Sequence, residues 1–251
     1  MNRYKRNRIY ISDSEQIRIK TFKILVAGSG IGSVIAECAL RLGFENITII
    51  DGDKVELTNL NRQNYIFTDI GKTKAKSIAM RLRSINPDAN IKIYDQFITN
   101  DNVNSLISQC DAAINALDFT SDIPFIFDEI CQSKNVPVLH PYNIGWAGLI
   151  FVVTPDGQNF SFLSKDFHQF EKKVVNHVLK SIDGQHNNTK GWLTHILSEY
   201  QKEGGNLPPP QLSIGSYLLA GGCTRLLYKL ALNLSVKRFP EFYLFGLEDT
   251  I

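Results

Sequence analysis

Two patterns of apolar residues take turns along the chain, one typical of strands and one typical of helices. Short runs of aliphatic residues, typical of buried strands, occupy residues 23–28, 46–51, 90–98, 111–117 and 136–157. Apolar positions recur with helical spacing over residues 32–43, 73–86, 101–110 and 123–135. Because strands that alternate with helices pair in parallel, we expect an α/β fold. The pattern predicts a Rossmann-like, doubly wound, mostly parallel sheet that binds ligands at the carboxyl ends of its strands.

The pattern changes after residue 157. We expect a helix, a polar connection, a proline-rich connection, a helix and a strand, in that order, over residues 165–182, 183–191, 204–211, 214–234 and 241–247. The chain is long enough for one large core, so we expect a single domain over residues 1–251. Within it, residues 1–20 would form an N-terminal arm and residues 158–211 a crossover region.

Composition restricts the partners of this protein. Of its 251 residues, 27 are Lys or Arg and 25 are Asp or Glu, so the net charge of +2 gives no basic footprint for DNA. Residues 1–20 lack the apolar core of a signal peptide, and no apolar stretch approaches the roughly 20 residues of a membrane-spanning helix. We therefore expect a cytoplasmic protein without a DNA or membrane partner.

The four cysteines are far apart in the sequence. Cys38, Cys110, Cys131 and Cys223 include no C-x-x-C pair, so neither a disulfide framework nor a zinc site is indicated. Residues 155–210 contain no cysteine, and Cys223 lies on the apolar face of a predicted helix, where a thiol is expected to be inert.

A glycine-rich loop follows the first predicted strand. The segment "GSGIGS" at residues 28–33 carries Gly28, Gly30 and Gly32, and small residues there let backbone N–H groups and the helix N-terminus meet a phosphate. Asp51 ends the second strand, where an acidic residue is placed to bind ribose hydroxyls. The glycine loop and Asp51 alone do not distinguish a nicotinamide or flavin enzyme from other nucleotide-binding proteins.

The polar stretch behind the second strand has no use in a dinucleotide enzyme. "DGDKVELTNLNRQNY" at residues 51–65 contains Asp53, Asn59, Arg62 and Gln63, and Lys74 follows in the first turn of the next helix. Such a density of hydrogen-bonding groups indicates a polar, multiply charged ligand. The cations match a triphosphate better than a pyrophosphate.

These segments together resemble the ThiF/MoeB/HesA family, the bacterial relatives of ubiquitin-activating enzymes. The resemblance rests on "RYKR" (3–6), "GSGIG" (28–32), "DGDKVELTNLNRQ" (51–63), "DIGKTKA" (69–75) and "NALD" (115–118). It implies that a carboxylate attacks the α-phosphorus of ATP and that pyrophosphate leaves. By the same resemblance, Asp51 holds the ribose and Asp118 binds Mg²⁺, while the phosphates are handled by Asn59, Arg62, Gln63 and Lys74.

The resemblance also implies a homodimer, because the arginine that matches Arg6 enters the site of the other subunit. Phe97 and Leu117 are candidates to flank adenine, although core packing explains both equally well. The candidate catalytic residues are thus Arg6, Arg62, Lys74 and Asp118. The candidate nucleotide-binding residues are Gly28, Gly30, Gly32, Asp51, Asp53, Asn59, Arg62, Gln63, Lys74 and Leu117.

Several residues have simpler explanations, and the chain departs from the family pattern. Taken alone, Lys74 could be a solvated lysine, Asp118 a helix cap and Asp53 a turn residue. The glycine loop is one residue shorter than usual before Ile31, and Asn115 replaces an acidic residue that is usual in relatives. Many relatives carry two C-x-x-C pairs for zinc, and others carry a thioester-forming cysteine; this chain has neither feature.

The sequence therefore predicts ATP-dependent adenylation of a carboxylate, with ATP and Mg²⁺ but no zinc and no enzyme thioester. The carboxylate-bearing substrate would be a protein or peptide C-terminus, such as that of a ubiquitin-like protein, or a small or RNA-linked acid. Two alternatives remain: a nucleotide-binding pseudoenzyme that acts as a scaffold subunit, favoured by the short glycine loop, and an NAD-dependent oxidoreductase, disfavoured by Arg62, Gln63 and Lys74.

Overall fold

A single mixed sheet organises the protein. The computed structural model describes residues 3–107, 109–164, 166–168, 170–182, 187–204 and 207–246. Within these ranges the sheet has the strand order β3-β2-β1-β4-β5-β6-β7. The strands are β1 (Lys23–Ala27), β2 (Asn46–Ile50), β3 (Asn90–Tyr94), β4 (Ala112–Asn115), β5 (Val138–Asn143), β6 (Ala147–Val153) and β7 (Phe242–Gly246). The first five pair in parallel and β6 and β7 pair antiparallel, which confirms the predicted Rossmann-like, mostly parallel sheet.

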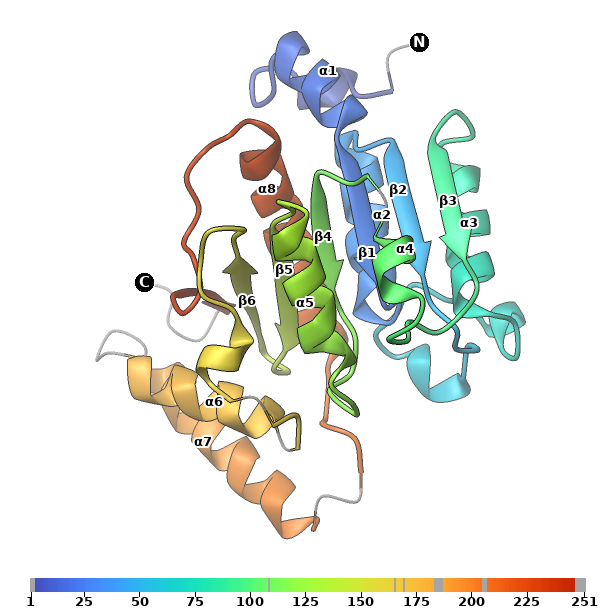
Figure 1. Cartoon of the computed structure of the whole chain (residues 1–251). Helices are drawn as coiled ribbons and strands as arrows, with labels where there is room; N and C mark the ends of the chain where they lie inside the picture. The colour runs from blue at the N-terminus through green and yellow to red at the C-terminus, as the bar shows by residue number, and fades with distance from the viewer. Residues whose placement is uncertain are drawn as a thin grey trace.

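Helices cover both faces of the sheet. The helical segments are η1 (Lys5–Asn7), α1 (Asp13–Thr21), α2 (Ile31–Leu42), η2 (Leu57–Asn59), η3 (Phe67–Asp69), α3 (Lys74–Ile85), α4 (Val103–Leu106), α5 (Ile123–Ser133), η4 (Phe160–Phe162), α6 (Phe170–Ser181), α7 (Asn187–Lys202) and α8 (Ser213–Ala231). In Figure 1, α2, α3 and α8 lie behind the sheet, while α4 and α5 lie in front of it. Helix α1 lies at the amino end of the parallel strands, and α6 and α7 lie toward their carboxyl end.

Alternation along the strands divides the apolar core in two. On β1, Ile24 and Val26 join the cluster that α2, α3 and α8 cover, whereas Leu25 and Ala27 join the cluster on the other face. The second cluster is rich in aromatic rings, and Phe170 of α6 packs on Phe119 with 4.6 Å between ring centroids. Through these rings the crossover region is attached to the chain that follows β4.

Three predicted elements differ from the structure. The helix expected over residues 101–110 is limited to α4, because the backbone leaves the helical conformation at Ile107, whose carbonyl accepts a 2.7 Å hydrogen bond from Lys134 Nζ. The third strand ends at Tyr94, whose carbonyl accepts from the Asp51 N–H at 3.1 Å. Part of the expected polar connection, from residue 187 onward, belongs to α7; residues 183–186 lie outside the described ranges.

The described part of the N-terminal segment is bonded to the body of its own chain. Tyr4 Oη donates to Glu45 Oε1 at 3.0 Å, and Asn7 Nδ2 donates to the Leu42 carbonyl at 2.9 Å. Helix α1 begins with a capping box between Ser12 and Glu15. No helix among the described residues is long and apolar enough to cross a membrane. The single-domain organisation over residues 1–251 stays a prediction.

Candidate functional site

The predicted site residues, apart from Arg6, lie at the carboxyl ends of the parallel strands. Gly28 directly follows β1, Asp51 follows β2, and Leu117 and Asp118 follow β4. Lys74 is the first residue of α3. Because β1 lies between β2 and β4 in the sheet, these segments meet where the strand order reverses. This is the position at which open α/β sheets bind ligands.

The glycine loop is shaped by close approaches that exclude larger residues. Gly28 has φ 84°, and a Cβ atom there would lie 2.4 Å from the Ala116 carbonyl oxygen. A Cβ at Gly30 would lie 3.3 Å from Gln63 Nε2. Gly30 is the N-cap of α2, whose first turn leaves backbone N–H groups without partners inside the helix. The loop therefore brings a helix N-terminus, Gln63 and the β4 loop to one place.

Asp51 connects the glycine loop to the polar stretch. Its Oδ2 accepts from Ser29 N at 2.6 Å and from Ser29 Oγ at 2.8 Å, and its Oδ1 accepts from Asp53 N at 2.8 Å. Tyr65 Oη donates to the Ser29 carbonyl at 2.7 Å from the other side. Sequence reasoning missed Ser29 and Tyr65. Since Oδ1 has one protein donor, it retains an acceptor position that suits a ribose hydroxyl.

A buried acid holds the polar stretch against two helices. Glu37 of α2 accepts from Asn64 Nδ2 at 2.9 Å and forms ion pairs with Arg41 and Arg81. Burial acts to raise the pKa of Glu37, but hydrogen bonds from Arg81 and Arg41 outweigh it and lower the pKa. The side chain of buried Asn59 accepts from Glu56 N at 3.0 Å, so Asn59 shapes the turn within this stretch. The phosphate role of Asn59 stays a prediction.

Neutral groups hold Arg62 in place, and the side chain of Gln63 next to it is partly unsatisfied. Arg62 Nε donates to Gln211 Oε1 at 2.7 Å, and Arg62 Nη1 donates to the Thr58 carbonyl at 2.9 Å and to Asn61 Oδ1 at 2.8 Å. Partial burial lowers the pKa of Arg62, and the negative charge of Asp118 acts against this shift. Gln63 Oε1 is buried without a hydrogen-bond partner among the described residues. A positioned guanidinium and an unsatisfied amide oxygen are features of a site that awaits a polar ligand.

Lys74 faces an acid across the site. Its Nζ lies 3.1 Å from Asp53 Oδ2, and its N–H donates to the Asp53 carbonyl at 2.8 Å. The Lys74 side chain is only 12% exposed, whereas that of Asp53 is 51% exposed. Lys74 is therefore a fixed cation. It is not the solvated surface lysine that one interpretation of the sequence allowed.

Asp118 lies among these charges. The residue keeps contact with solvent, yet loss of water around its carboxyl raises its pKa. Four nearby charges also act on the pKa of Asp118. Lys74 and Arg62 lower it, and Asp53 and Asp51 raise it. The predicted charged residues thus meet around Asp118. A residue that sequence reasoning missed also belongs here, because burial and then the Asp118 charge raise the pKa of Glu171 in α6.

The donor set fits a Mg²⁺ ion that is shared with a phosphate. No cluster of three or more His, Cys, Asp or Glu suited to a metal occurs among the described residues. Magnesium commonly takes only one or two protein carboxylates and fills its other positions with water and phosphate oxygens. Asp118, with Asp53 as a nearby second acid, provides that number.

Arg6 is not brought to this site by its own subunit. It is exposed in η1, whose neighbour Asn7 bonds to the Leu42 carbonyl at the far end of α2. The twelve residues of α2 separate that end from the glycine loop by about 18 Å at 1.5 Å per residue. Arg6 therefore lies apart from the other predicted site residues of its own chain, and its catalytic role stays a prediction.

A buried polar network supports the loop that carries Asp118. Asn115 Nδ2 donates to the Pro124 carbonyl and to Asp128 Oδ1, both at 2.9 Å. His140 Nε2 lies 2.9 Å from the same Oδ1 and 2.8 Å from Asp128 Oδ2. Asn115, Asp128 and His140 are each at most 4% exposed. The network joins the end of β4 to α5 and β5, directly before the turn that leads to Asp118.

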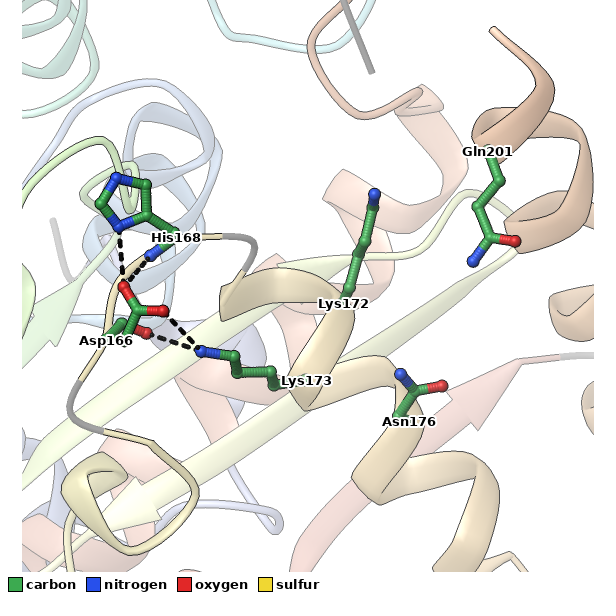
Figure 2. A pocket seen from close by; sticks show the side chains of 6 residues that line it. All are labelled: Asp166, His168, Lys172, Lys173, Asn176 and Gln201. Carbon is green, nitrogen blue, oxygen red and sulfur yellow. Dashed lines mark hydrogen bonds and ion pairs between the residues drawn. The ribbon is translucent and has the colours of Figure 1, made fainter. Parts of the chain in front are cut away.

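A second hollow lies between α6 and α7 (Figure 2). It has a volume of about 520 Å³ and is lined by Asp166, His168, Lys172, Lys173, Asn176 and Gln201. None of these residues was singled out from the sequence, because they belong to a region whose pattern indicated only a helix and a polar connection.

The fold and site define an α/β protein whose charged residues gather at the carboxyl ends of its parallel strands. The chain belongs to the ThiF family, whose family model matches residues 4–243. This confirms the resemblance that the sequence motifs suggested.

Individual relatives match shorter parts of the chain. It is 26% identical over 161 residues to the SAMP-activating enzyme E1 of Haloferax volcanii, a match that covers 62% of this chain and 59% of that protein. It is 31% identical over 159 residues to the sulfur carrier protein ThiS adenylyltransferase of Bacillus subtilis, covering 61% and 47%. The crystal structure of E. coli MccB with ATP is similar in fold, with a TM-score of 0.69, 17% identity, and coverage of 98% of this chain and 71% of that one.

Proposed function

We propose that the protein is an adenylyltransferase that uses ATP to activate a carboxylate. A carboxylate oxygen attacks the α-phosphorus of ATP, the bond to the bridging oxygen breaks, and pyrophosphate leaves, so that an acyl adenylate remains. The observation that carries the proposal is the group of fixed charges around Asp118, formed by Arg62, Lys74 and Asp53. Family membership and the adenylyltransferase name of the Bacillus subtilis relative support it.

The charges match the needs of the reaction. Negative charge moves onto the leaving pyrophosphate, and cations that are already in place stabilise this charge without reorganisation. Arg62 is oriented by three neutral acceptors, so a phosphate can contact it without breaking an ion pair among the described residues. Lys74 can exchange Asp53 for a phosphate oxygen. Asp118 and Asp53 would hold the Mg²⁺, which neutralises phosphate charge when bound.

ATP with Mg²⁺ should raise the melting temperature of the protein, because a ligand that binds only the folded state stabilises it by mass action. Asp118→Ala should remove most of the rise in melting temperature that depends on Mg²⁺, and it should abolish ATP–pyrophosphate exchange. Differential scanning fluorimetry and an exchange assay measure the two effects, with Glu129→Ala as a control because Glu129 is exposed on α5. Equal stabilisation by NAD would refute the proposal, and ATP binding without exchange on any acid would favour the scaffold alternative.

We further propose that no enzyme thioester forms. Burial raises the pKa of Cys110 to about 11 and also raises the pKa values of Cys131 and Cys223. At neutral pH these thiols are therefore protonated and poorly nucleophilic.

A variant with all four cysteines replaced by Ala or Ser should keep its ATP–pyrophosphate exchange activity, provided that circular dichroism shows it is folded. The reason is that none of the thiols takes part in the adenylation step. Exchange reports only the adenylation step, so the thioester itself is tested by intact-mass spectrometry of the wild-type protein after reaction. A substrate adduct that hydroxylamine releases from a cysteine would contradict the proposal.

The same site supports a homodimer. Arg6 cannot reach the site of its own subunit, and the segment around it exposes apolar side chains: Ile9 at 94%, Tyr10 at 87% and Ile17 at 66%. The stretch that carries Arg62 is also bordered by exposed apolar residues, namely Leu57, Ile66, Phe67 and Ile70. Exposed apolar groups gathered in this way favour contact with another protein surface. We propose that a second copy brings Arg6 beside Asp118.

The substrate would be a carboxylate at the end of a protein or peptide. Small and RNA-linked acids could undergo the same reaction. The crossover region at residues 158–211 would determine which of these carboxylate substrates is bound.

A further inference from the structure

The hollow between α6 and α7 contains a lysine, Lys172, that forms no ion pair with any of the described residues around it. Lys173 Nζ contacts Asp166 Oδ2 at 3.3 Å and donates to Ser164 Oγ at 2.8 Å. Asp166 is also bound by His168, whose Nδ1 lies 2.7 Å from Asp166 Oδ1. Figure 2 shows the contacts of Asp166 with Lys173 and His168, and draws none to Lys172. Lys172 is half-buried and has no hydrogen bond or ion pair with any residue that the structure describes.

The acid in this hollow is already committed to other groups. Hydrogen bonds from the backbone and side chain of His168 lower the pKa of Asp166 to about 2. The charge of Asp166 therefore compensates that of Lys173. The charge of Lys172 is not compensated by any residue in the lining of the hollow. Asn176 and Gln201 line the remaining walls, and each has an amide group that is able to donate a hydrogen bond. The chemistry of the hollow is that of a site for one oxyanion.

The helix α6, which lines the hollow, also contacts the loop that carries Asp118. Glu171 precedes Lys172 in the chain, and its pKa responds to the charge of Asp118. Phe170, one residue earlier, packs on Phe119, which follows Asp118. The first turn of α6 thus contacts the Asp118 loop, while Lys172 faces the hollow. A substrate with its reacting carboxylate near Asp118 would pass this helix.

We propose that the hollow binds an acidic side chain of the peptide or protein whose carboxylate is adenylated. The inference rests on the proposed function and adds a determinant of specificity to it. A single uncompensated lysine with two amides suits one carboxylate, whereas a nucleic acid would require several cations along its phosphates. Lys172 then selects substrates that carry an acidic residue upstream of their C-terminus.

Binding of a simple anion tests the site without any enzymatic reaction. Inorganic phosphate is titrated into the protein saturated with α,β-methylene-ATP and Mg²⁺, so that the nucleotide site is filled, while amide NMR signals of α6 are recorded. Lys172→Glu should weaken phosphate binding by about tenfold or more, because a charge-assisted contact is lost and a like charge replaces it. Lys180→Glu is the matched control, since Lys180 is exposed on the same helix outside the hollow. Equal affinity in both variants would overturn the proposal.

A peptide library tests the occupant. Peptides that end in a free carboxylate and carry Asp, Asn or Lys upstream are compared by ATP–pyrophosphate exchange. The wild type should prefer acidic peptides, and Lys172→Glu should shift the preference to basic ones while Lys180→Glu does not. Exchange with no charge preference would overturn only the role of the hollow. Exchange with no peptide would overturn the peptide occupant, whereas the proposed function itself is refuted only if no acid of any class supports exchange. Salt-sensitive tRNA binding that is lost in Lys172→Glu would replace the peptide with an RNA.

Discussion

Asn115→Asp is expected to lower the free energy of unfolding by about 3 kcal/mol or more and to abolish ATP–pyrophosphate exchange. Asn115 Nδ2 donates to Asp128 Oδ1 and to the Pro124 carbonyl, so a carboxylate at position 115 would face two acceptors instead of donating to them. An uncompensated charge buried at this depth costs about 3 to 5 kcal/mol. Exchange would be lost because the network holds the turn that presents Asp118.

The effect should depend on Asp128. In the double variant Asn115→Asp with Asp128→Asn, the amide and the carboxylate change places, and the amide oxygen now at position 128 can still accept from His140 Nε2–H. The double variant should therefore regain part of its stability and activity, whereas Asp128→Asn alone should be milder than Asn115→Asp. Urea unfolding and exchange assays on the four proteins form a double-mutant cycle. Additive effects, with no recovery in the double variant, would show that Asn115 and Asp128 do not act together.

This network also explains a departure from the family pattern. By the sequence resemblance, an acidic residue is usual at the position of Asn115; here Asp128 of α5 places a carboxylate beside that position. The sequence could indicate that Asn115 was unusual, but it could not identify Asp128 as its partner, because the two residues lie 13 positions apart on different elements. Pairing across elements becomes visible only when β4 and α5 are placed side by side.

The position of the nucleotide site could be predicted because it depends on strand order alone. Gly28, Asp51 and Asp118 each follow a parallel strand, and the carboxyl ends of such strands share one edge of the sheet. The contacts between these residues could not be predicted. The sequence assigned Asp51 to a ribose, whereas the structure shows its carboxylate binding Ser29 and the Asp53 N–H, so Asp51 also shapes the shortened glycine loop.

The crossover region was predicted least well. Helix α7 starts within a polar stretch that contains Gly191, a residue about 1 kcal/mol less favourable than Ala in a helix interior. Few of its apolar residues are buried; Leu193 is 4% exposed, whereas Ile196 is 38% exposed. Its sequence therefore lacks the strong apolar stripe by which α2 and α3 were found. Of the residues that line the hollow, Gln201 was missed for the same reason, whereas those of the predicted helix over residues 165–182 were missed because nothing in the sequence places α7 beside them.

Mixing inactive Arg6→Ala and Asp118→Ala subunits is expected to restore activity. The N-terminal segment is bonded to Glu45 and Leu42 of its own subunit, at the opposite end of α2 from the glycine loop, so Arg6 must serve the other subunit if it serves any site. In a heterodimer, the body of the Arg6→Ala subunit would receive the intact arginine of the Asp118→Ala subunit. The second site of that heterodimer would carry both defects.

Random exchange of subunits makes half of the dimers heterodimers, each with one intact site, so about a quarter of the wild-type activity per site should return. ATP–pyrophosphate exchange measures the recovery, and native mass spectrometry of one tagged variant verifies that subunits have exchanged. Arg8→Ala is the control, because Arg8 lies in the same exposed segment and should leave activity unchanged. If Arg6→Ala alone stays active, or if verified heterodimers remain inactive, Arg6 has no role in the neighbouring site, and the stabilisation of the pyrophosphate rests on Arg62 and Lys74 within one subunit.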